Sequence, residues 1–174
     1  MCAELFTETA RLILRRMTPS DIPALRRILQ DPDVMYAYEG PFTDEEVQAW
    51  LDKQLTRYRE DGFGLCAVVL RETGEMIGQC GLTMQDIPGK RVLEVGYLFQ
   101  KAFWHKGYAT EAAIACKEYA FTVLGADEVY SIIRDSNTAS QNVARRNGMV
   151  PVGSFVKHYR GVDMPHLIFC VRRT

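Results

Sequence analysis

The sequence predicts a single α/β (α+β) domain in which a mixed, seven-stranded sheet is covered by about four helices. Strand-like and helix-like segments follow one another in the order strand, helix, helix, three strands, helix, strand, helix, two strands. No Pro-, Gly- or Ser-rich linker and no internal repeat divides residues 1–174, a length that one hydrophobic core can serve. With 47% hydrophobic and 25% charged residues, the composition is that of an ordinary globular protein.

The first part of the chain is predicted to form one strand and two helices. The segment RLILRR at 11–16 alternates apolar and basic residues, which is typical of a strand. Segments 18–31 and 43–60 each place their apolar residues on one helical face. A capping box from Thr43 to Glu46 marks the start of the second helix, and acidic residues fill its first turn.

The middle of the chain is predicted to contain three strands and a third helix. The strands are expected at 64–70, 76–84 and 92–99, with a tight turn after the first and a loop at 85–91 after the second. The helix is expected at 109–124. Its inward face carries small residues that would let it lie close to a sheet, namely Ala112, Ala113, Cys116 and Ala120.

The last third is predicted to add a strand, a helix and a hairpin. EVYSII at 128–133 has the composition of a buried strand, and the helix at 137–148 ends on Asn147-Gly148, a good C-terminal stop. Segments 150–159 and 164–173 then close as a hairpin around the turn RGVD.

Charge and cysteine usage exclude several classes of protein. Lys plus Arg number 21 and Asp plus Glu 22, so neither nucleic acid nor an anionic membrane is expected as the main partner. No apolar run approaches the roughly 18 residues of a membrane-spanning helix, and the N-terminal segment does not read as a signal peptide. The five cysteines show no CxxC pair and no metal-ligand spacing with the three histidines, so we expect reduced thiols, a cytoplasmic protein and no metal site. They are Cys2, Cys66, Cys80, Cys116 and Cys170.

The stretch WHKGYATEA at 104–112 connects a predicted strand to a predicted helix through a turn that contains glycine. The first amides of a helix have no partner within the helix, and the helix dipole favours negative charge at the same end. This stretch therefore predicts an anion-binding turn. The alternative is an ordinary loop followed by the start of a helix.

Four segments in this order resemble the GNAT acyl-CoA N-acyltransferases, and within them the ribosomal-protein-alanine N-acetyltransferase (RimJ/RimL) type. The segments are TARLILRRMTPSDIPAL, TGEMIGQCGL, EVGYLFQKAFWHKGYATEA and NTASQNVARRNGMVPVGS, which together cover nearly the whole chain. The resemblance implies a GNAT-like fold and an enzyme that moves the acetyl group of acetyl-CoA to a primary amine. The attack would be direct, within a ternary complex, so no nucleophilic Ser or Cys is required.

The resemblance also implies where acetyl-CoA binds. The pyrophosphate would lie on the amides of 105–110, with Lys106 as a nearby charge and with Gly107 and Ala109 small enough for backbone to approach the phosphates. His105 stands where the family motif usually has glycine. The backbone of the preceding strand would meet pantetheine and the acetyl carbonyl, and Gly96 would permit an irregularity there. The implied cofactor-binding residues are Tyr97, Leu98, Phe99, His105, Lys106, Gly107, Tyr108, Ala109, Thr110, Asn137 and Ser140.

Two residues are the candidates for proton transfer. Glu94 is a lone carboxylate within an apolar strand, which is costly unless it is used or paired, so it is the candidate general base. The alternatives are that Glu94 faces solvent or pairs with an arginine. Many GNAT enzymes carry a tyrosine as proton donor, but the matching position here is Ala144, so Ser140 of NTAS is the candidate in its place. Asn137 would bind the pantetheine amides, serve as a helix N-cap, or do both.

The acceptor is expected between the first two helices, their connection and the final hairpin. Tyr36, Tyr38 and Glu39 lie in that connection, and aromatic walls with one carboxylate suit a cationic amine such as a peptide N-terminus or a polyamine. The aromatics would equally serve to pack the two helices. A peptide amine and a small-molecule amine both remain open, as do a monomer and a homodimer.

Two rival classes of function can be weighed against the sequence. A nucleotide-binding oxidoreductase is not supported, because the GxGxxA pattern at 62–67 precedes a strand instead of opening a helix after one. A non-catalytic acyl-CoA-binding or sensing module remains the alternative, because the usual tyrosine is absent at Ala144.

Overall fold

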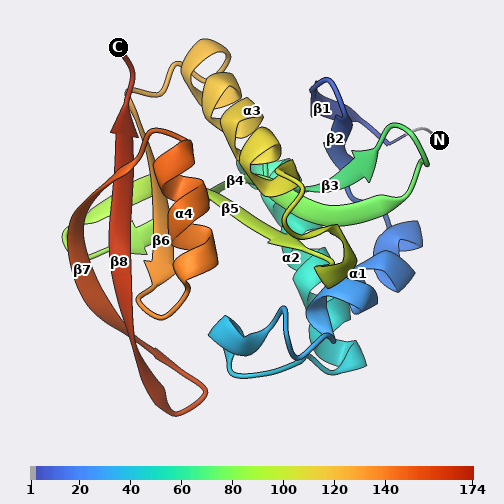
Figure 1. Ribbon diagram of the computed structural model, residues 1–174, viewed down its shortest axis with the longest axis horizontal. Coiled ribbons are helices and arrows are strands. Elements are labelled where there is room, and N and C mark those ends of the chain that lie inside the picture. The colour runs from blue at the N-terminus through green and yellow to red at the C-terminus, as the bar shows by residue number, and fades with distance from the viewer. Residues whose placement is uncertain (1–2) are drawn as a thin grey trace.

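The computed structural model describes residues 3–174, which form one mixed sheet with helices on both faces (Figure 1). The strands are β1 (Leu5–Glu8), β2 (Leu12–Arg16), β3 (Leu65–Leu70), β4 (Met76–Ile87), β5 (Lys90–Phe99), β6 (Glu128–Arg134), β7 (Val150–Tyr159) and β8 (Val162–Arg172). The helices are α1 (Ile22–Leu29), α2 (Asp44–Glu60), α3 (Tyr108–Thr122) and α4 (Thr138–Arg146). Short 3₁₀ turns lie at η1 (Pro19–Asp21), η2 (Tyr36–Tyr38) and η3 (Lys101–Phe103).

The sheet has eight strands in the order β1-β2-β3-β4-β5-β6-β8-β7. Only β5 and β6 run parallel to each other, and every other neighbouring pair is antiparallel. One core lies between the sheet and the pair α3 and α4, and a second core lies between the sheet and the pair α1 and α2 (Figure 1). The predicted fold class and all four helices are therefore confirmed.

The predicted number of strands was one too low, because β1 was missed. This strand is only four residues long, lies at the edge of the sheet and leaves Leu5 54% exposed, so it carries no clear apolar alternation. The expected loop at 85–91 is also wrong: β4 and β5 continue through it and Ile87 pairs with Lys90. The polar residues of that stretch lie on the exposed end of a hairpin, where side chains carry little information about pairing.

The helix boundaries follow the local signals in the sequence. At the start of α2, Glu46 N–H donates to Thr43 Oγ1 at 3.2 Å and Thr43 N–H donates to Glu46 Oε1 at 3.1 Å, which confirms the capping box. The small face of α3 is completely buried, as predicted, against the sheet. It consists of Ala112, Ala113, Cys116 and Ala120. None of the helices within residues 3–174 is both long and apolar enough to cross a membrane.

The sheet opens between β5 and β6. These parallel strands share one register pair, Glu94 with Tyr130, whereas β4 and β5 stay in regular register along their whole length. Past that pair, side chains replace the missing ladder bonds: Ser131 Oγ donates to the carbonyl of Val95 at 2.8 Å, and Ile132 N–H donates to Glu94 Oε2 at 2.8 Å. The opening therefore comes from the divergence of β6. No irregularity at Gly96 is needed, because Gly96 stays paired with β4.

Candidate functional site

A cavity of about 450 Å³ lies beside this opening, and Glu94 is in its wall. Its lining comes from β5 and β6, from α2 and from the β7–β8 hairpin, with Asn137 and Ser140 added at the start of α4. Segments far apart in the sequence thus meet around one carboxylate. This is the arrangement expected of a binding site at the middle of an open sheet.

Glu94 is half-buried and its environment makes it a suitable base. Burial raises the pKa of the carboxyl to about 7, although the charges of Lys157 and Arg57 and the hydrogen bond from Ile132 act in the opposite direction. Within residues 3–174, no basic side chain lies within ion-pair distance of this carboxylate. A carboxyl that titrates near neutral pH can both accept and release a proton under physiological conditions.

The backbone of β5 presents polar groups to the opening. Backbone N–H and C=O groups alternate between the two edges of a strand. Because the carbonyl of Val95 faces β6, the backbone groups of Tyr97 and Phe99 face the opening, whereas those of Leu98 face β4. The carbonyl of Phe99 accepts a hydrogen bond from Trp104 Nε1 at 2.9 Å, which ties the end of β5 to the turn that follows it.

On the far side of the opening, α4 brings Asn137 and Ser140 to the cavity. Asn137 Oδ1 accepts a hydrogen bond from Ser140 N–H at 3.2 Å, so this side chain is the N-cap of α4. Tyr97 Oη donates to the carbonyl of Ser140 at 2.8 Å, which holds β5 and α4 together across the gap. Burial raises the pKa of Tyr97, so its hydroxyl stays protonated.

Removing that hydroxyl is expected to loosen the opening. Tyr97→Phe removes this hydrogen bond, although the Ser140 carbonyl keeps its helical bond from Ala144 N–H, so we expect the free energy of unfolding to fall by about 0.5–1.5 kcal/mol. Chemical denaturation measures this directly. Tyr119→Phe is the matched control, because Tyr119 is also half-buried and its hydroxyl has no hydrogen-bond partner within residues 3–174. Equal losses in the two variants would show that the Tyr97 hydrogen bond contributes nothing specific.

The turn at 104–107 leads into α3 with an unusual backbone. His105 and Gly107 both have positive φ, at 61° and 81°. Gly107 is the N-cap of α3 and offers no side-chain cap, whereas Thr43 caps α2 and Asn137 caps α4. The amides of the first turn of α3 are therefore left for another acceptor.

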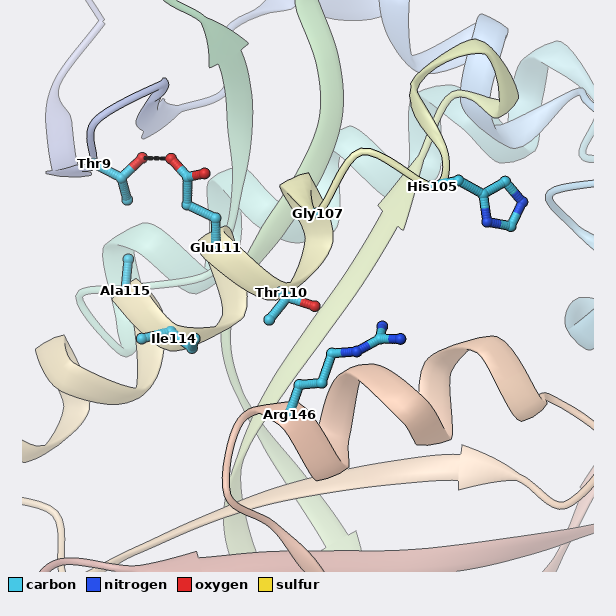
Figure 2. A pocket seen from close by; sticks show the side chains of 8 residues that line it. All are labelled: Thr9, His105, Gly107, Thr110, Glu111, Ile114, Ala115 and Arg146. Atoms are coloured by element: carbon cyan, nitrogen blue, oxygen red, sulfur yellow. Dashed lines mark hydrogen bonds between the residues drawn. The ribbon is translucent and has the colours of Figure 1, made fainter.

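A second cavity, of about 800 Å³, opens over this first turn. Figure 2 shows that Arg146 extends from α4 toward Thr110 and the first turn of α3, which adds a positive charge beside the helix N-terminus. The residues that line the cavity are Thr9, His105, Gly107, Thr110, Glu111, Ile114, Ala115 and Arg146. Free amides, a helix dipole and a guanidinium are together suited to a negatively charged group.

The turn is also held by Arg11, the residue just before β2. Its guanidinium donates to the carbonyl of Lys106 at 3.0 Å and to Glu111 Oε2 at 2.7 Å, and it lies 4.3 Å from the centre of the Tyr108 ring. Thr9 Oγ1 donates to the other carboxylate oxygen of Glu111 at 2.6 Å (Figure 2). Burial opposes the ionised form, but these hydrogen bonds from Thr9 and Arg11 lower the pKa of Glu111, which stays charged.

The predicted phosphate-binding residues are thus divided between two positions. His105, Gly107 and Thr110 line the second cavity, whereas Lys106 is exposed and its ammonium lies 5.7 Å from the Phe103 ring. Arg146 was not predicted. Its neighbour on α4, Arg145, has its guanidinium carbon 5.5 Å from the centre of the Phe169 ring. The two adjacent arginines differ only in the side of the helix from which they project.

The predicted acceptor residues are also divided. Tyr38 lines the first cavity and meets Tyr159 of β7 edge to face, with ring centres 6.3 Å apart. Tyr36 is 44% exposed and lies outside the cavity lining. Glu39 forms an ion pair with Arg134 at 2.6 Å, so its charge is already balanced by a protein cation.

Sequence reasoning missed the basic residues of this cavity. Lys53 and Arg57 of α2 follow Trp50 at three and seven positions, so all three share one face of the helix, and Lys157 comes from β7. That spacing is visible in the sequence, but basic residues beside an apolar stripe usually face water. Within residues 3–174, no group of three or more His, Cys, Asp or Glu side chains is placed to hold a metal ion.

Comparison of the sequence with known proteins identifies a matching family model and a relative. A family model described as an acetyltransferase (GNAT) domain matches residues 11–150. The uncharacterized protein YkkB of Bacillus subtilis (strain 168) is 36% identical over 142 residues, which cover 81% of this chain and 83% of YkkB.

Solved structures share the fold along nearly the whole chain. An acetyltransferase of the GNAT family from Bacillus anthracis superposes with a TM-score of 0.82 and 25% identity, covering 96% of this chain and 98% of its own. The apo form of RimL, a ribosomal L7/L12 alpha-N-protein acetyltransferase, superposes with a TM-score of 0.84 over 99% of this chain and 96% of its own. At 18% identity, this second likeness concerns the fold alone.

Proposed function

The chain belongs to the GNAT acetyltransferase family and is an acyltransferase, and from this premise we propose that it moves the acetyl group of acetyl-CoA to a primary amine by direct attack in a ternary complex. The observation that carries the proposal is the Glu94 carboxylate, with its pKa near 7, in the opening between β5 and β6. Family membership and the presence of this base support a catalytic enzyme rather than a non-catalytic acyl-CoA-binding module.

The residues around the opening fit acetyl-CoA. The uncapped amides of Tyr108, Ala109 and Thr110, together with Arg146, are suited to the pyrophosphate. The backbone of Tyr97 and Phe99 faces the gap and is suited to pantetheine. The remaining proposed contacts come from Leu98, His105, Lys106, Gly107, Asn137 and Ser140. When bound, acetyl-CoA supplies the thioester whose C–S bond is exchanged for a C–N bond.

Two side chains would move the protons. Glu94 takes a proton from the incoming ammonium, directly or through one water, and so leaves a neutral amine as nucleophile. Ser140 Oγ donates a proton to the sulfur as the C–S bond breaks and regains one from solvent, and the nitrogen of the tetrahedral intermediate releases its second proton to solvent as the amide forms. This role for Ser140 is supported by its position in the cavity wall, where Tyr97 and Asn137 hold its backbone.

We propose a peptide N-terminus or a small-molecule amine as acceptor. The RimJ/RimL type is a proposal that rests on the four sequence segments, and RimL itself acts on ribosomal L7/L12 according to its name. A cytoplasmic location is supported by Cys66, Cys80, Cys116 and Cys170, all of which are free thiols. We propose that the enzyme works as a monomer or a homodimer.

Calorimetric titration of the purified protein tests the cofactor. Acetyl-CoA is expected to bind with a dissociation constant on the order of micromolar, whereas NAD and ATP are expected to give no heat of binding. A panel of primary amines, assayed for release of free CoA thiol, then tests turnover. Binding of NAD, or of none of the three ligands, would contradict the proposed function.

A further inference from the structure

The cavity that holds Glu94 is strongly basic. Lys53 and Arg57 reach it from α2, Lys157 from β7 and Arg134 from the end of β6, and Glu94 is the one carboxylate among the residues of the described chain that line it. An incoming ammonium would be repelled by this set of charges. The cavity wall is therefore poorly suited to a simple cationic amine.

Most of these cations have no acidic partner. Arg134 is paired with Glu39, but across residues 3–174 no carboxylate oxygen lies within 4.0 Å of Lys53, Arg57 or Lys157. Partial burial and the charges of Arg57 and Lys157 lower the pKa of Lys53, and burial lowers the pKa of Arg57. Several cations that disfavour one another at one cavity would be stabilised by a bound anion.

A buried hydrogen-bond donor in the same wall also lacks an acceptor. Gln79 is completely buried on β4, and its Oε1 accepts from Trp50 Nε1 at 2.9 Å. Its Nε2 has no hydrogen-bond partner within residues 3–174, although Gln79 lines the cavity. An unsatisfied buried amide is costly, so the wall that carries the cations also holds a polar group that no residue of the described chain satisfies.

The cavity is closed on one side by the tip of the β7–β8 hairpin. Arg160 at the tip forms an ion pair with Glu46 of α2, and its guanidinium lies 5.2 Å from the centre of the Phe42 ring. The edge-to-face contact of Tyr38 with Tyr159 closes the same side. The whole cavity, with its volume of about 450 Å³, is in the range of small-molecule sites.

We propose that the acceptor is a small primary amine that also carries a carboxylate or phosphate group, which Lys53, Arg57 and Lys157 bind while the amine faces Glu94. This inference rests on the proposed function and names the substrate class for the same site. The bound anion offsets the repulsion of the ammonium, and the cations favour the neutral amine that attacks.

Matched pairs of acceptors test the proposal. γ-Aminobutyrate is compared with butylamine, and phosphoethanolamine with ethanolamine, by titration into the protein–CoA complex and by turnover with acetyl-CoA, corrected for the fraction of neutral amine. We expect at least one acceptor with an anionic group to exceed its partner without that group by about 10- to 100-fold in kcat/KM, the size of one or two charge-assisted hydrogen bonds. Comparing the two pairs distinguishes a carboxylate from a phosphate.

Lys157→Met is expected to reduce the preference for the anionic acceptor about tenfold, whereas the control Arg59→Met leaves it unchanged. Arg59 is an exposed residue of α2 outside the cavity. Equal kcat/KM values within each pair, or better turnover of a peptide without acidic residues, would overturn the inference and leave the proposed function standing. If no amine is acetylated, the proposed function fails, and the titrations still decide whether amines that carry an anionic group bind in preference to those that lack one.

Discussion

Glu94→Gln is expected to lower kcat/KM for acetyl transfer by about 10²- to 10⁴-fold, the usual contribution of a general base. Glutamine keeps the shape of the side chain and retains an oxygen that can accept from Ile132 N–H, so the divergence of β5 and β6 is preserved. What is lost is the ability to take a proton from the acceptor. Glu72→Gln, on the exposed turn between β3 and β4, is the matched control.

The pH dependence of this variant gives an independent test. Burial raises the pKa of Glu94 to about 7, so wild-type kcat/KM is expected to rise as the pH increases through 7 and the carboxylate forms. The variant should lose that rise and keep only the titration of the acceptor amine. A pH profile that still rises through 7 in Glu94→Gln would show that another group is the base.

Measuring the stability of Glu94→Gln distinguishes a variant that has lost catalysis from one that has lost its fold. A raised pKa means that the folded chain holds this proton more tightly than the unfolded chain does, so this stabilising contribution is complete below about pH 4.5 and is lost as the pH rises through about 7. Glutamine cannot ionise. Thermal unfolding at pH 8 should therefore find Glu94→Gln at least as stable as the wild type, and a lower melting temperature would contradict the assigned cause of the shift.

Gly107→Val is expected to weaken acetyl-CoA binding by about 10- to 100-fold, a loss of one or two charge-assisted hydrogen bonds. Gly107 has a φ of 81°, which a β-branched residue avoids, and a Cβ atom there would meet Arg11 Nη2 at 3.4 Å. The turn would have to move, and the first amides of α3 would move with it. Calorimetric titration with acetyl-CoA measures the loss of affinity.

Gly125→Val distinguishes this effect from general strain. Gly125 follows the other end of α3 and has a φ of 68°, and a Cβ atom added there would meet no atom within 4 Å. The two substitutions place similar strain on the backbone, on the order of 1–3 kcal/mol. Only the one at Gly107 should change affinity for acetyl-CoA, and equal losses in both variants would remove the turn from the proposed binding site.

The predictions from sequence were accurate where a local rule decides the structure. The capping box of Thr43 and Glu46 is a signal that depends only on residues three positions apart. The small side chains of Ala112 and Cys116 indicate a helix face that packs closely against another element. Glu94 was identified because a lone carboxylate in an apolar strand is costly, and the structure places it in the wall of a cavity. Such signals need only neighbours in the sequence.

Other features depend on partners that are distant in the chain. The edge strand β1 exists because it pairs with β2, and the opening beside Glu94 exists because β6 diverges after Tyr130. Arg11 belongs to a segment that the sequence predicts as an alternating strand, yet its side chain contacts residues 95 and 100 positions away. Such contacts cannot be predicted from the residues that are neighbours in the sequence.

The sequence by itself therefore determined the order of the four helices and of seven of the eight strands, the family, and the turn that is proposed to bind phosphate. Only the tertiary structure decided which charges meet around Glu94. Lys53 of α2 and Lys157 of β7 are ordinary basic residues until the hairpin folds against α2 and brings them to one cavity. The physical reason is that the spacing of apolar residues along the chain shows which face of a helix or strand is buried. The electrostatic field at a site is instead the sum of charges from several helices and strands, which come together only when the protein folds.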